Sequence, residues 1–68
     1  MKYNIGQQVQ YYYSNTELRT GEVVEYDEAA NRYRVYWHTA VSTRPGSDWV
    51  GHPNKRTWVK ADALQEAK

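Results

Sequence analysis

The chain contains no cysteine, so neither a disulfide nor a thiolate-bound metal can stabilise it. No apolar run approaches the roughly 20 residues that a transmembrane helix needs. The first six residues also lack the apolar core of a signal peptide. Glycine occurs only at four isolated positions, which excludes a glycine-rich phosphate-binding loop. These absences predict a cytoplasmic protein with no membrane segment.

Neither sign of charge dominates, because nine Lys and Arg residues face eight Asp and Glu residues, a net charge of +1. Bulk charge therefore argues against a strongly basic nucleic-acid domain and against an acidic mimic. The distribution is uneven, however. Residues 14–28 hold five acids and one base, whereas residues 29–60 hold six bases and one acid. The near-neutral total thus conceals a candidate basic face.

Aromatic residues are abundant: seven Tyr and three Trp make 15% of 68 residues, and Phe is absent. A chain of this length forms one domain, over residues 1–68, with a small core. Tyr and Trp carry a polar group beside a large apolar surface, so they suit binding faces as well as cores. For the core we expect six residues: Val9, Tyr11, Val23, Val35, Trp58 and Leu64.

Alternating side chains predict β-strands over residues 8–13, 20–26, 32–39 and 57–60. Residues 61–64 favour one helical turn. The intervening residues 40–56 contain two turn signals, around Pro45-Gly46 and around Pro53. This stretch forms either a long loop, which is often functional, or two long bent strands joined at Pro45-Gly46.

Four segments carry a family resemblance: Ile5-Gly6-Gln7-Gln8-Val9, Gly21-Glu22-Val23-Val24, Tyr33-Arg34-Val35-Tyr36-Trp37, and Trp58-Val59 followed by Leu64. Together they resemble the small SH3-like barrels of the Tudor, chromo-barrel and KOW type. The resemblance implies an all-β fold, a single five-stranded SH3-like barrel with a one-turn helix near the C-terminus. It also implies binding to methylated peptide, to nucleic acid or to another protein.

A second resemblance concerns the plasmid-borne dihydrofolate reductases that have an SH3-like barrel. Their sequences are similar to this one at His52-Pro53 and Ala63-Leu64. Where those enzymes carry a Val-Gln-Ile-Tyr pore segment, this chain has Arg56-Thr57-Trp58-Val59. The resemblance therefore does not extend to their activity.

The leading functional hypothesis is a non-enzymatic interaction module that binds a protein or peptide partner through an aromatic surface. Tudor-type modules hold methylammonium groups in an aromatic cage by cation–π attraction. The candidate residues for such a surface are Tyr13, Tyr36, Trp37 and Trp49. Asp48 is the candidate acid beside it.

The alternative hypothesis is a barrel that binds DNA or RNA through a basic face, with Tyr36 and Trp49 stacking on bases. The candidate basic residues are Arg32, Arg34, Arg44, Lys55 and Arg56. A purely structural explanation is that Glu22 and Glu25 pair with Arg32 and Arg34 across a hairpin. Basic residues and exposed aromatics on one face would favour nucleic acid. An aromatic pocket with an acid beside it would favour a cationic peptide.

No catalytic or metal-binding constellation is evident, and we expect no cofactor and no metal. His38 and His52 are too few to form a metal site without cysteines or clustered carboxylates. Asp48, His52 and the nearby serines lack the nucleophile elbow and oxyanion hole of a hydrolase. A third hypothesis is a homo-oligomeric enzyme whose site is built across subunits.

Overall fold

A computed structural model describes residues 2–67 as one antiparallel sheet of six strands. The elements are β1 (Gln8–Ser14), β2 (Glu17–Asp27), β3 (Arg32–Ser42), β4 (Val50–Gly51), β5 (Lys55–Lys60), the 3₁₀-helix η1 (Ala61–Ala63) and β6 (Gln65–Glu66). The strand order is β4-β3-β2-β1-β6, and β5 also pairs with β3. The predicted all-β class is confirmed, as is a short helical turn after the fifth strand.

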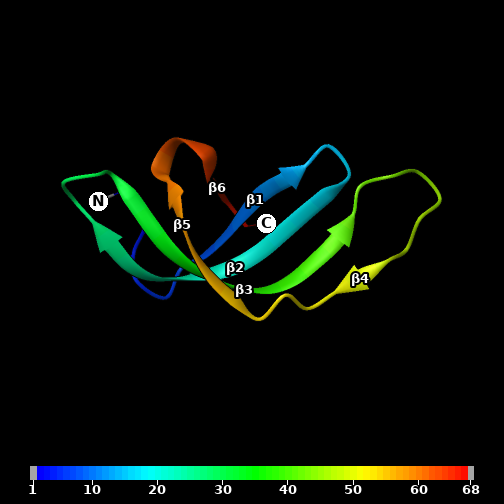
Figure 1. Cartoon of the computed structure of the whole chain (residues 1–68), viewed down its shortest axis with the longest axis horizontal. Helices are drawn as coiled ribbons and strands as arrows, with labels where there is room; N and C mark the ends of the chain where they lie inside the picture. The colour runs from blue at the N-terminus through cyan, green and yellow to red at the C-terminus, as the bar shows by residue number, and fades with distance from the viewer. Residues whose placement is uncertain (1, 68) are drawn as a thin grey trace.

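The sheet is a trough, bent along the long strands β2 and β3 (Figure 1). The β2–β3 hairpin forms one end, and the β1–β2 and β3–β4 loops form the other (Figure 1). Register shifts between Thr20 and Gly21 and between Val23 and Glu25 interrupt the β2–β3 ladder. Such bulges bend a strand and increase its twist. The half of the trough under β5 and η1 is filled by the core. The half near β4 is open.

Trp37 and Gly21 occupy the middle of the trough, paired across β3 and β2. The Trp37 indole is only 1% exposed and its Nε1 donates to Thr57 Oγ1 at 2.7 Å, which fixes β5 against β3. A Cβ atom at Gly21 would approach Trp37 Cε3 to 2.8 Å and Val35 Cγ1 to 2.7 Å. Glycine at this position therefore leaves the space that the buried indole occupies.

Two tyrosine hydroxyls connect the chain ends to the core. The Tyr33 hydroxyl accepts hydrogen bonds from the backbone amides of Lys2 at 2.7 Å and Tyr3 at 3.0 Å. The Tyr3 hydroxyl donates to the Leu64 carbonyl at 2.9 Å. The rings of Tyr3 and Tyr33 pack edge to face, 5.3 Å apart. Burying these tyrosines is favourable because each polar group finds a partner.

The core confirms four of the expected residues and corrects a fifth. Tyr11 is partly buried and packs against the core. Trp58 is wrong as a core residue, since it is 42% exposed and its neighbour Val59 points inward instead. The buried hydrophobic residues are Tyr3, Val9, Val23, Tyr33, Val35, Trp37, Ala40, Val59, Ala61 and Leu64.

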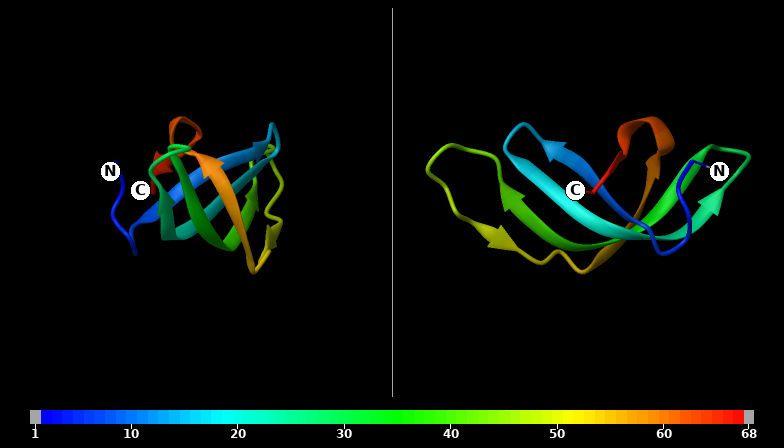
Figure 2. Two further views of the ribbon diagram at one scale, coloured as in Figure 1. Left: turned by 60° about the vertical axis from the view of Figure 1, so that its left-hand side comes forward. Right: turned by 180° about the vertical axis from the view of Figure 1, so that it is seen from behind.

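The sheet is not closed: β5 and β6 do not pair with each other (Figure 2). Residues 40–56 are closer to the bent-strand prediction than to one long loop. Strand β3 continues to Ser42, and β4 pairs with it at Ala40 and Val41. The turn between them surrounds Pro45-Gly46, as expected.

Replacing Gly21 by alanine should lower the free energy of unfolding by about 3 kcal/mol, because the new methyl group meets backbone and buried side chains. Gly46→Ala is the matched control. Gly46 has a positive φ of 78° but no atom near its Cβ position, so about 1 kcal/mol is expected there. Urea denaturation of both variants measures the difference. Equal losses would contradict the close packing of Trp37 on Gly21.

Candidate nucleic-acid interface

Basic and aromatic side chains gather on the convex face of the β3–β5 ladder. The register pairs Arg32 with Lys60, Arg34 with Trp58, and Tyr36 with Arg56. Directly opposed residues of an antiparallel pair lie on the same face. The intervening residues Tyr33, Val35 and Val59 are buried, so this six-residue set faces outward. We call it the β3–β5 surface.

Local contacts position the aromatics of this surface. The Arg56 guanidinium lies 5.2 Å from the centroid of the Tyr36 ring, and the Tyr36 hydroxyl donates to Asn54 Oδ1 at 3.0 Å. Asn54 has a left-handed φ of 53°, which suits the turn before β5. Trp58 lies between Arg56 and Lys60 along the same face of β5 and is 42% exposed. The Trp58 ring is therefore open to a ligand, and the Tyr36 ring is flanked by the Arg56 guanidinium.

The neighbouring strand β2 carries the opposite charge on this face. Glu25 lies across from Arg34, with 3.6 Å between Oε1 and Nη1. Of the predicted pairing of Glu22 and Glu25 with Arg32 and Arg34, the structure thus shows one ion pair, Glu25 with Arg34. Asp27, not Glu22, lies opposite Arg32, whereas Glu22 lies opposite Tyr36. The Glu25–Arg34 pair is substantially exposed, so it contributes little stability and chiefly reduces the free charge of Arg34.

Three of the five predicted basic residues share the β3–β5 surface: Arg32, Arg34 and Arg56. Lys55 does not, because it lies opposite the buried Trp37 and faces the concave side of the sheet. Arg44 lies in the loop between β3 and β4. The prediction missed Trp58 and Lys60. Extending the alternation of β5 back to Arg56 would have placed Arg56, Trp58 and Lys60 on one face.

The four predicted aromatics do not form one surface. Tyr36 belongs to the convex face, whereas Trp37 is a core residue, which corrects its assignment to a binding surface. Strand alternation puts Trp37 on the same face as Tyr33 and Val35. Tyr13 and Trp49 are exposed near the open end of the trough, and Trp49 is 51% exposed.

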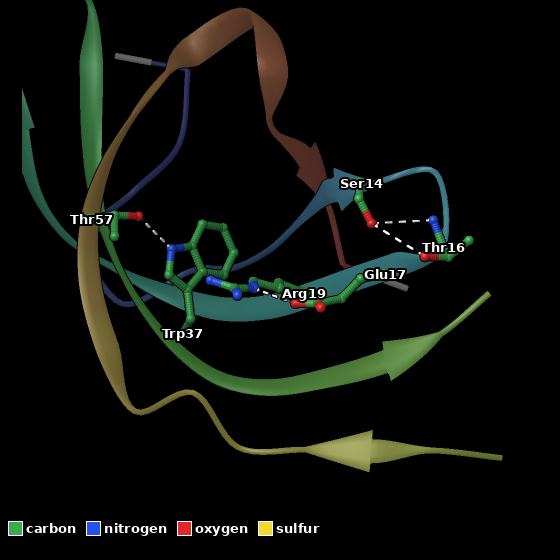
Figure 3. Close-up of polar contacts among 6 residues, drawn as sticks. All are labelled: Ser14, Thr16, Glu17, Arg19, Trp37 and Thr57. Atoms are coloured by element: carbon green, nitrogen blue, oxygen red, sulfur yellow. Dashed lines mark hydrogen bonds and ion pairs between the residues drawn. The ribbon is translucent and has the colours of Figure 1, made fainter.

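The Tyr13 ring already contacts a cation of the protein itself. The Arg19 guanidinium carbon lies 3.7 Å from the Tyr13 ring centroid, and Arg19 Nε donates to Glu17 at 2.6 Å (Figure 3). The ring thus faces the Arg19 cation, and Glu17 is paired with that same cation. This arrangement argues against a cage for a methylammonium group at Tyr13. Asp48 lies in the exposed loop that precedes Trp49.

Within residues 2–67, no three His, Asp or Glu side chains come together as metal ligands. In the same part of the chain, no helix has the length and hydrophobicity needed to cross a membrane. Comparisons with protein-family models, with curated proteins and with solved structures find no match to this chain.

The three tryptophans should differ in their accessibility to a quencher. Trp58→Phe and Trp49→Phe should each lower the fraction of fluorescence that acrylamide quenches, because both rings are about half exposed. The double variant, which retains only buried Trp37, should be quenched least. Strong quenching of the double variant would contradict the burial of Trp37.

Proposed function

We propose that this protein binds single-stranded nucleic acid through the β3–β5 surface. The observation that carries the proposal is the meeting of four cations, Arg32, Arg34, Arg56 and Lys60, with two aromatics on one face. Exposed rings and flanking cations are the elements of a single-strand platform, in which bases stack and phosphates contact the cations. Trp58 is the main stacking residue, and Tyr36 is the second.

The acidic neighbouring strand favours a single strand over a duplex. Glu25, Asp27 and Glu28 line a hollow of about 560 Å³ against one side of Trp58. A duplex presents phosphates over a broad surface and would bring some of them to these carboxylates. A single strand can follow β3 and β5 and avoid them. The acids therefore confine the ligand to the basic strands.

The expected affinity is moderate and dependent on salt. Glu25 partly neutralises Arg34, which leaves Arg32, Arg56 and Lys60 as the principal phosphate contacts. Three such contacts to a single strand correspond to a slope of about −2 in a plot of log affinity against log salt concentration. A slope near zero would argue against phosphate contacts.

We further propose that the sheet is an open form of an SH3-like barrel. It is supported by the meander of β1, β2 and β3, by η1 before the last strand, and by the pairing of β6 with β1. In this proposal the barrel is open beside β5. Small barrels of this kind present strand faces and loops to their ligands.

A protein or peptide partner is the second candidate function. One observation favours it: Tyr12, Leu18, Val41 and Val50 lie in register across four strands on the convex face. Tyr12 and Val50 are more than half exposed. Such a row of apolar side chains is a typical element of a protein interface. Replacing both Leu18 and Val50 by threonine should weaken binding of a protein or peptide to this row without changing oligonucleotide binding.

Reversing the charge of Arg56 should abolish measurable binding of a fluorescein-labelled single-stranded oligonucleotide at low salt. Arg56→Glu removes a phosphate contact and adds repulsion beside Tyr36. Arg44→Glu changes the net charge equally but lies in the β3–β4 loop, so its binding should stay within about twofold of the original protein. Fluorescence anisotropy at two salt concentrations measures both. Equal losses would indicate a nonspecific effect of net charge.

Trp58→Ala should weaken binding of the same oligonucleotide by about 1–3 kcal/mol, the usual contribution of one stacked base. The unfolding free energy should change little, because Trp58 is not part of the core. Trp49→Ala is the control, since Trp49 lies near the open end of the trough. If Trp49→Ala weakens binding and Trp58→Ala does not, the ligand lies on the other side of the sheet.

A further inference from the structure

A hollow separate from the β3–β5 surface lies at the open end of the trough, on the concave side. Here a hollow of about 350 Å³ has walls that include Glu17, Arg19, Trp49, His52 and Lys55. A volume of this size falls at the lower end of the range for small-molecule pockets. The β3–β5 surface lies on the other face of the sheet, so the two sites can be tested independently.

Arg19 is held in one conformation at the wall of this hollow. Its guanidinium packs on the Tyr13 ring, and Nε donates to Glu17 (Figure 3). Its side chain is only 16% exposed. Within residues 2–67, its two terminal amino groups make no hydrogen bond, so they are free to donate. A pre-positioned pair of N–H donors is suited to a carboxylate or a phosphate.

The remaining polar groups make the hollow favourable for an anion. Lys55 starts from the concave face of β5 and lines the same space. His52 Nδ1 lies 2.9 Å from the His38 carbonyl oxygen. A carbonyl can only accept, so Nδ1 donates and the ring orientation is fixed. Arg19 and Lys55 thus provide two cations against one carboxylate, that of Glu17.

Trp49 provides a flat apolar wall. A Cβ atom at Gly51 would come within 2.7 Å of Trp49 Cζ2 and 2.8 Å of Cη2. The indole therefore lies directly against the backbone of β4, and glycine is needed at position 51 for that contact. About half of the indole is exposed and can pack on a planar group.

We infer that this hollow binds a small organic anion in which a carboxylate or phosphate group is attached to a planar ring. The anionic group accepts hydrogen bonds from the terminal amino groups of Arg19 and contacts the Lys55 ammonium. The ring packs on Trp49. Glu17 stays paired with Arg19 Nε and orients the guanidinium without blocking its outer edge.

The test is an NMR titration of the ¹⁵N-labelled full chain with phenyl phosphate, with phenylacetate and with neutral benzyl alcohol. Both anions should give saturable shifts at the Trp49 indole N–H, the Arg19 Nε–H and the Gly51 amide. Benzyl alcohol should bind at least about tenfold more weakly, because it offers no charge to Arg19. Comparing the two anions identifies which anionic group the site prefers.

Variants separate this site from general surface charge. Arg19→Lys keeps the charge but loses the paired donors. It should therefore lower the affinity for the preferred anion by about tenfold. Lys55→Gln should lower the affinity for the anion several-fold. Because Lys55 is exposed, this substitution should not disturb folding. Gly51→Ala should displace Trp49 and remove the indole shift. Arg56→Gln, on the convex face, should leave anion binding unchanged and weaken only oligonucleotide binding.

Several outcomes would overturn the inference. These are the absence of saturable shifts with either anion at millimolar concentrations, equal binding of benzyl alcohol, or unchanged anion affinity in both Arg19→Lys and Lys55→Gln. Shifts confined to Arg32, Arg56 and Lys60 would place the anion on the β3–β5 surface instead. Failure here with intact oligonucleotide binding would leave the proposed function standing.

Discussion

The contact between the Trp37 indole and Gly21 is the constraint on which the rest of the structure depends. It lies where the long strands bend, and the indole N–H connects β3 to Thr57 of β5. With β5 fixed in this position, its alternation turns Val59 into the core and Arg56, Trp58 and Lys60 outward. One buried side chain thus determines both where the core ends and which residues make the convex surface.

The two candidate sites use charge differently. On the convex face, a row of cations lies beside a row of acids, and only one close cross-strand pair, Glu25–Arg34, joins them among residues 2–67. A flexible polyanion can follow the exposed cations. In the concave hollow, Arg19 is packed on Tyr13 and bonded to Glu17, so its donors are oriented before any ligand arrives. Such pre-organisation suits a small ligand, because little side-chain entropy remains to be lost.

Strand positions and the helical turn could be predicted because apolar residues alternate clearly in β1, β2 and β3. Two tryptophans were assigned wrongly, Trp58 to the core and Trp37 to a binding surface. Trp58 and Trp37 both lie in strand patterns, and one is exposed while the other is buried. Which side chains of β5 turn toward the core depends on its register with β3, and that register is fixed by tertiary contacts. The division of the basic residues was missed because the predicted strand began at residue 57. Lys55 and Arg56 lie within β5, so these sequence neighbours face opposite sides.

The pairing of β6 with β1 has a consequence for the order in which the sheet forms. Gln65 and Glu66 pair with Gln10 and Val9, and the Leu64 carbonyl accepts the hydroxyl of Tyr3. These contacts join segments that are far apart in sequence, so they form only after the intervening strands have brought the two segments together. Until β6 pairs, the outer edge of β1 presents unpaired backbone amides and carbonyls, which can pair with a strand of another chain.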